Sequence, residues 1–129
     1  MLRLESEEAI NSATSFIVKF EVRYRASWGQ VVKVSGSSEP LGNWNVEKGL
    51  ELHWTPGDLW TGQTQIRDVA MNTIEFKYAV VADGRARWEQ GYNRRAVLND
   101  GAEKVDGKIV RTFRHEWRGR DPQARSEAS

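Results

Sequence analysis

The residue types that most often carry catalysis or bind metals are sparse in this sequence. Its 129 residues include no cysteine and two histidines, His53 and His115, which lie on separate segments without the spacing of metal ligands. The acidic residues Asp100, Glu103 and Asp106 gather around one turn, where solvated carboxylates are the ordinary case. No nucleophile elbow, glycine-rich phosphate loop or HExxH pair is present. We therefore expect no enzyme activity, no metal and no cofactor.

Tryptophan is the residue type whose number calls for an explanation. An indole ring offers a large, flat and rigid apolar surface with little rotamer entropy to lose on binding. The core of one small domain does not need six of these rings, so we expect some of them at the surface for binding. The six tryptophans are Trp28, Trp44, Trp54, Trp60, Trp88 and Trp117.

Two of the tryptophans lie among polar residues next to turns. Trp44 follows a Gly-Asn pair, which typically opens a tight turn, and Trp88 follows a hairpin expected at residues 83–84. Lys77 is on the outward face of the strand before that hairpin, so Lys77 and Trp88 can meet on adjacent strands. The alternative for Trp44 is a buried anchor that holds its loop.

Short strands are the elements that would position these residues. Residues 16–25 and 73–82 alternate between apolar and mostly polar side chains, as half-buried strands do. With the turns between them, the segments predict an antiparallel, all-β sandwich of immunoglobulin-like architecture with seven to eight strands. We expect one domain over residues 16–118, between a flexible lead-in at 1–15 and a polar tail at 119–129. The expected strands include 16–25, 31–35, 50–54, 59–66, 73–82, 85–90 and 108–117.

The charge balance indicates a neutral partner. Nineteen Lys and Arg residues face eighteen Asp and Glu residues, a net charge of +1, which argues against a nucleic-acid partner. No apolar run approaches the roughly 20 residues of a membrane span, so no membrane partner is expected. The lack of cysteine and of a signal peptide favours an intracellular setting, plastid or cytosol, and a monomer is the default. The arginines near the C-terminus are expected to be a solvated strand face and tail (Arg111, Arg114, Arg118, Arg120 and Arg125).

Five short motifs, in order between Phe20 and Trp117, resemble the starch-binding domain, carbohydrate-binding module family 20. The resemblance covers about 100 residues. Five motifs in the right order and at compatible spacings are far more specific than any one of them. The motifs are Val-Ser-Gly-Ser at 34–37, Leu-Gly-Asn-Trp at 41–44, Asp-Leu-Trp at 58–60, Glu-Phe-Lys-Tyr at 75–78 and Trp-Glu-x-Gly-x-Asn-Arg at 88–94.

This resemblance implies a noncatalytic module that binds α-1,4-glucans: starch, glycogen, malto-oligosaccharides and cyclodextrins. Such a module targets an attached or associated protein to the polysaccharide, so a longer parent protein is expected. In the family, two tryptophans form an angled platform under adjacent glucose rings, and these match Trp44 and Trp88. Lys77 and Asn93 match residues that hydrogen-bond the sugar hydroxyls, and Glu89 matches a further polar contact.

The resemblance also implies a second sugar site around Trp28. Its aromatic partner in this chain is either His53 or Trp54. Alternation along 50–54 puts Trp54 on the same face as two leucines, which makes it a candidate for the core instead. Trp60, from the Asp-Leu-Trp motif, is expected to pack in the core. The alternative function, from a different class, is a protein-interaction sandwich whose exposed tryptophans bind another polypeptide.

Overall fold

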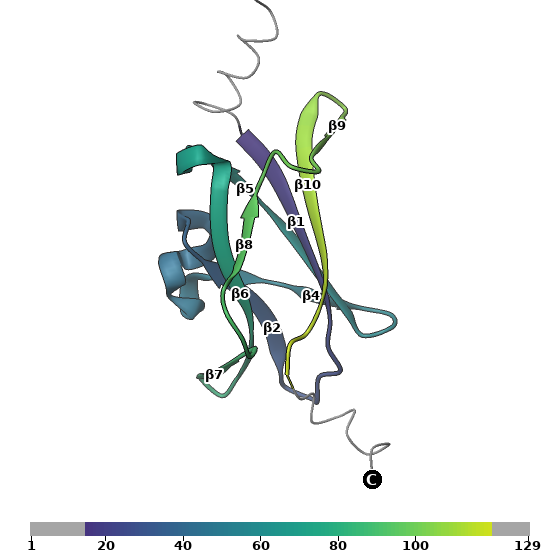
Figure 1. Cartoon of the computed structure of the whole chain (residues 1–129). Coiled ribbons are helices and arrows are strands. Elements are labelled where there is room, and N and C mark those ends of the chain that lie inside the picture. The colour runs from purple at the N-terminus through teal and green to yellow at the C-terminus, as the bar shows by residue number, and fades with distance from the viewer. Residues whose placement is uncertain (1–14, 120–129) are drawn as a thin grey trace, which may run out of the picture.

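The structure of the chain, a computed structural model, describes residues 15–119 and consists of two facing β-sheets (Figure 1). This confirms the predicted β-sandwich. The first sheet has the order β4 (His53–Thr55), β5 (Leu59–Arg67), β1 (Ser15–Arg23), β10 (Lys108–Glu116) and β9 (Glu103–Val105). The second has the order β3 (Leu50–Glu51), β2 (Val31–Gly36), β6 (Thr73–Ala82) and β7 (Arg85–Trp88), with β8 (Arg94–Val97) also paired to β6.

Three short 3-10 helices lie in the connections between the strands. They are η1 (Glu39–Trp44), η2 (Val46–Lys48) and η3 (Ala70–Asn72). Within residues 15–119, none of the helices has the length and apolarity needed to cross a membrane. The expected lead-in and tail lie outside the described residues, apart from Ser15, which already belongs to β1, and Gly119.

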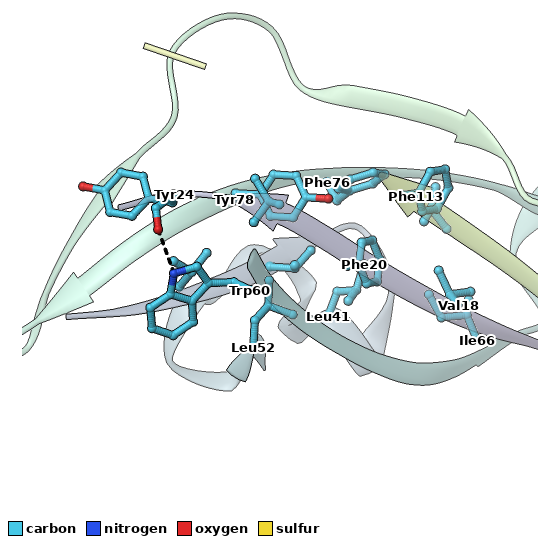
Figure 2. Packing of buried hydrophobic residues seen from close by; sticks show 14 of the residues in the cluster. Val18, Phe20, Tyr24, Leu41, Leu52, Trp60, Ile66, Phe76, Tyr78 and Phe113 are labelled. Carbon is cyan, nitrogen blue, oxygen red and sulfur yellow. Dashed lines mark hydrogen bonds between the residues drawn. The ribbon is translucent and has the colours of Figure 1, made fainter. Parts of the chain in front are cut away.

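The core lies between the two sheets and is built by the alternation seen in the sequence. The even-numbered residues 16–22 of β1 and the residues Ile74, Phe76 and Tyr78 of β6 are essentially inaccessible to solvent. Phe20 is central, because its ring lies 5.1 Å from the ring of Phe76 and 5.6 Å from that of Phe113 (Figure 2). Burial of this aromatic and aliphatic surface is the main force that holds the two sheets together.

Trp60 is a core residue, as expected. It is 6% exposed, and its indole Nε1 donates a hydrogen bond of 3.0 Å to the carbonyl oxygen of Tyr24 (Figure 2). A buried indole N–H needs such an acceptor, because an unpaired buried donor is costly. Trp60 is therefore mainly a packing residue, although it also lines the cavity that contains Trp28 and Trp54.

Two features of the strand pairing differ from the expectation. The neighbours β1 and β10 are parallel, whereas all other pairs are antiparallel. The single strand expected at 50–54 is two strands in different sheets, because β3 pairs with β2 and β4 pairs with β5. Alternation along a strand defines its two faces but carries no information about its partner or its direction.

Candidate functional site

Trp44 and Trp88 form an angled aromatic surface, here called the tryptophan pair. Their ring centroids are 6.2 Å apart and their planes are inclined by 54°. Trp44 ends η1 and is 38% exposed, and Trp88 ends β7 and is half-buried. Trp44 is therefore not a buried loop anchor, and the pair presents two tilted indole faces at the surface of the second sheet.

An unusual backbone turn presents Trp44. Gly42, Asn43 and Trp44 are consecutive residues with positive φ angles of 84°, 50° and 69°. The left-handed region is rare for a bulky side chain, and a residue held there costs on the order of 1–3 kcal/mol. Two backbone hydrogen bonds hold the turn, from Asn43 N to Ser38 O at 3.1 Å and from Asn45 N to Gly42 O at 2.9 Å. The turn fixes the backbone from which the Trp44 side chain projects toward Trp88.

Lys77 lies beside Trp88, as the strand arrangement predicts. Trp88 pairs with Ala79 in the β6–β7 ladder, so Lys77, two residues along the same face of β6, is its diagonal neighbour. The ammonium group of Lys77 donates a 2.8 Å hydrogen bond to the carbonyl oxygen of Gly91. An ammonium carries three donors, so this bond orients Lys77 and leaves donors for a ligand.

Asn93 is oriented by a residue that the sequence analysis did not assign. Its Nδ2 donates a 3.1 Å hydrogen bond to Oε1 of Glu75, and Glu75 in turn lies 3.9 Å from the guanidinium of Arg95. The amide of Asn93 keeps its carbonyl oxygen and a second N–H for a ligand. Glu75 could have been found, because it lies two residues before Lys77 in the Glu-Phe-Lys-Tyr motif and therefore shares its face.

Glu89 does not offer its side chain to a ligand, which corrects the expected polar contact. Its carboxylate is not exposed and accepts hydrogen bonds from Arg94 at 2.8 and 2.9 Å, from the Tyr78 backbone N–H at 3.1 Å and from the Arg118 backbone N–H at 3.3 Å. Successive side chains of an extended segment point to opposite faces, so when Trp88 points outward Glu89 points inward.

A second aromatic surface surrounds Trp28. Trp28 is fully exposed and Trp54 is 54% exposed, and both line a cavity of about 760 Å³. The Nε1 of Trp54 donates a 3.0 Å hydrogen bond to Oδ1 of Asp58, which lines the same cavity. The bond fixes the indole of Trp54 beside the loop that carries Trp28.

The structure decides which of the two candidate partners lies with Trp28. Trp54 is paired with Trp60 across the β4–β5 ladder and His53 is paired with Thr61, so Trp54 and His53 point to opposite faces. His53 does not line the Trp28 cavity. The alternative placement of Trp54 in the core is wrong, because its side chain is 54% exposed. Trp54 faces the same side as buried Trp60, but β4 is the edge strand of its sheet within residues 15–119.

The pKa values that the protein shifts clearly are those of Tyr78 on β6 and His115 on β10. The hydroxyl of Tyr78 and Nδ1 of His115 are 2.9 Å apart. Burial, followed by the charge of Arg94, lowers the pKa of His115 from 6.5 to about 4. Burial also raises the pKa of Tyr78 well above its ordinary value of 10. His115 is thus a neutral packing residue at pH 7 and is not placed to exchange protons with a ligand.

Comparison with known proteins identifies the family. A family model described as a starch binding domain matches residues 15–107. The 4-alpha-glucanotransferase DPE2 of Oryza sativa subsp. japonica is 32% identical over 115 residues, which is 85% of this chain and 11% of the relative. Starch-binding domain-containing protein 1 of Rattus norvegicus is 33% identical over 104 residues, 79% of this chain and 27% of the relative. The chain thus spans a small part of these relatives.

Solved structures share the same fold. The glycoside hydrolase family 15 glucoamylase from Hypocrea jecorina superposes with a TM-score of 0.71 at 26% identity, over 84% of this chain and 18% of that one. The family 20 carbohydrate-binding module of the maltotetraose-forming amylase from Pseudomonas saccharophila STB07 has a TM-score of 0.54 at 20% identity, over 75% and 99%, a likeness in fold alone. Because the family match covers most of the sandwich, the chain belongs to the starch-binding domain family, carbohydrate-binding module family 20.

Proposed function

We propose that this starch-binding domain holds α-1,4-glucans on the tryptophan pair, with Lys77 and Asn93 as its hydrogen-bonding partners to sugar hydroxyls. The observation that carries the proposal is the 54° inclination of two indole rings 6.2 Å apart. Each ring can stack on the apolar C–H face of one glucose unit. Two inclined planes match successive units of a curved α-glucan better than the flat chain of cellulose.

The polar groups around the pair suit a neutral, hydroxyl-rich ligand. Lys77 and Asn93 are each held by one hydrogen bond inside the protein and keep further groups for sugar hydroxyls. The net charge of +1 supplies no strong field for a charged ligand. Family membership and these hydrogen-bonding groups favour a glucan over the alternative partner, another polypeptide.

Titration with β-cyclodextrin, followed by tryptophan fluorescence, tests this site. Trp44→Ala or Trp88→Ala should each reduce the binding free energy by about 2 kcal/mol, as central aromatic residues of binding sites do, which is about 30-fold in Kd. Cellohexaose is the ligand control, and thermal melts show that both variants are folded. Wild-type affinity in both folded variants would contradict the assignment.

We also propose that Trp28 and Trp54 form a second glucan site. The support is a cavity of about 760 Å³ that both indoles line, with Trp54 fixed by Asp58. In calorimetric titration with β-cyclodextrin, the wild type should bind two ligands and Trp28→Ala one, because the tryptophan pair is left intact. A stoichiometry of one in the wild type, unchanged by the substitution, would exclude the second site.

The domain itself is proposed to be a noncatalytic monomer that concentrates a linked or associated protein on the polysaccharide, without nucleic-acid or membrane contacts. Tethering of this kind raises the effective concentration of the partner at its substrate. The longer relatives support the proposal, since the matched domain is 11% and 27% of their lengths. The isolated domain should release no reducing sugar from soluble starch, and release would contradict the proposal.

A further inference from the structure

We propose that the buried ion pair between Glu89 and Arg94 is a positioning device that holds Trp88 and Asn93 in their sugar-binding geometry. The inference rests on the proposed function of the tryptophan pair. It assigns to Glu89 and Arg94 a role without ligand contact: they act through the residues next to them. Three sets of observations support it: the residues that adjoin the ion pair in the sequence, its contacts with β6 and β10, and the exposure of the loop residues between Glu89 and Arg94.

The ion pair closes the loop of residues 88–94 at both ends. Glu89 directly follows Trp88, and Arg94 directly follows Asn93. Arg94 donates a hydrogen bond to each carboxylate oxygen of Glu89, from Nε to Oε2 at 2.9 Å and from Nη2 to Oε1 at 2.8 Å. A two-point contact of this kind fixes the relative orientation as well as the distance of the two side chains. The Cα atoms of Trp88 and Asn93 are therefore constrained together.

The same ion pair connects the loop to the strands beneath it. Oε2 of Glu89 accepts a 3.1 Å hydrogen bond from the backbone N–H of Tyr78, the residue after Lys77 on β6. Arg94 donates a 2.7 Å hydrogen bond to the carbonyl oxygen of Glu116 at the end of β10, and its guanidinium lies 5.2 Å from the centre of the Tyr78 ring. These contacts fix the position of the loop relative to β6, the strand that carries Lys77.

Between Glu89 and Arg94 the loop is held by hydrogen bonds and not by packing. The Gln90 N–H donates to the Arg118 carbonyl at 3.0 Å, and the side chains of Lys77 and Arg118 donate to the carbonyls of Gly91 and Tyr92 at 2.8 and 2.7 Å. The loop residues Gln90, Gly91, Tyr92 and Asn93 are all exposed and belong to no strand. Without buried side chains of its own, the loop cannot be fixed by packing. Glu89, in contrast, has a side chain with no exposed surface, and that of Arg94 is 10% exposed.

Energetics agree with a role in positioning. Burying two charges carries a large desolvation penalty that their attraction only partly offsets, so a buried ion pair is weak evidence for stability. A role in specifying conformation is consistent with this cost. An apolar pair could fill the same space, but it could not accept the Tyr78 N–H and the Arg118 N–H as Glu89 does. These directional bonds constrain the backbone next to Trp88 and Asn93, while Glu75 orients the Asn93 amide.

The test compares Glu89→Gln with two matched controls. Val18→Ala removes buried surface in β1, in the other sheet, and reports what general destabilisation does to binding. Arg114→Gln removes the exposed pair with Glu21, 3.5 Å apart, and reports what loss of a surface ion pair does. At a temperature where all variants are folded, Glu89→Gln should raise the Kd for β-cyclodextrin by about tenfold because the loop is no longer preorganised. Both controls should keep the wild-type Kd.

A ligand-free spectroscopic measurement reports the geometry directly. Two indoles 6.2 Å apart and inclined by 54° should give an exciton couplet in far-ultraviolet circular dichroism, which Trp44→Phe identifies by removing it. Glu89→Gln should weaken the couplet, and Val18→Ala should not. If Glu89→Gln fails to fold, Arg94→Lys replaces it, since lysine keeps the charge but cannot make the two-point contact, and a weaker couplet is again expected.

The outcomes separate this inference from the proposed function. An unchanged couplet with unchanged affinity in the folded ion-pair variant would overturn the positioning role, and so would an equal loss of affinity in Val18→Ala. If the wild type bound no β-cyclodextrin, the proposed function would fail, and the couplet would still decide whether the ion pair orders the two indoles.

Discussion

Replacing Gly42 by alanine should disturb the sugar site through the backbone turn that carries Trp44. Gly42 is buried, with a φ angle of 84°. A Cβ atom at this position would lie 2.8 Å from the carbonyl carbon of Lys48 and 2.9 Å from the nitrogen of Gly49. Both are backbone atoms, so neither can rotate away as the end of a side chain could. The overlap must be relieved by moving the turn that carries Trp44 or the chain at 48–49.

The expected magnitude has two parts. An L-residue in the left-handed region costs about 1–2 kcal/mol, and forcing an extra methyl group into a filled space costs about 1–3 kcal/mol. Gly42→Ala should therefore lower the free energy of unfolding by about 3 kcal/mol and the Tm by about 11 °C for a domain of this size. The displaced turn should also weaken β-cyclodextrin binding by about tenfold, since Trp44 loses its fixed orientation.

Gly107→Ala is the matched control. Gly107 has a similar φ angle of 78°, but a Cβ atom there would meet no atom within 4 Å. Gly107→Ala therefore adds the strain of a left-handed L-residue but no overlap of the new methyl group with other atoms. Gly107 lies in the β9–β10 hairpin, in the other sheet. Thermal melts and cyclodextrin titrations on both variants decide the matter. If Gly42→Ala is no less stable than Gly107→Ala and binds as the wild type does, the role given to the turn is wrong.

Two further predictions concern Trp54 and His115. Trp54→Ala should remove one of two β-cyclodextrin sites while the neighbouring His53→Ala keeps both, because only Trp54 lines the Trp28 cavity; equal stoichiometry in the two variants would contradict the assignment. The pKa of His115 falls from 6.5 to about 4 on folding, so between these values the unfolded chain binds the proton first. The free energy of unfolding is therefore unaffected by His115 protonation above pH 6.5 and decreases as the pH falls to about 4. The expected decrease is about 2 kcal/mol for a half-buried ring. Urea unfolding between pH 4 and 7 measures it, and His115→Gln should flatten the dependence.

The core was predictable from the sequence because alternation reports burial directly. Phe20 and Phe76 are on the apolar faces of their segments, and the structure packs them against each other. The parallel pairing of β1 with β10 was not predictable, because the pattern of faces is the same for either strand direction. The division of residues 50–55 between two sheets, with β3 paired to β2 and β4 paired to β5, was not predictable for the same reason.

The candidate site was predictable only in part. The closeness of Trp44 and Trp88 came from the family motifs, because no local pattern relates a 3-10 helix after β2 to the end of β7. Glu89 was misjudged because a motif gives the order of residues and not the direction of each side chain. Its neighbour Trp88 takes the outward face, which leaves the inward face for the carboxylate.

The parallel neighbours β1 and β10 have a mechanical consequence. Their register runs from Phe16 beside Ile109 to Arg23 beside Glu116, so β1 begins at one end of the sandwich and β10 finishes at the other (Figure 1). A pull applied across Ser15 and Glu116 would act along both strands in opposite senses. It would load all the hydrogen bonds between them in shear at once, not one after another as in unzipping. This shear geometry would resist a force that pulls the two ends of the domain apart.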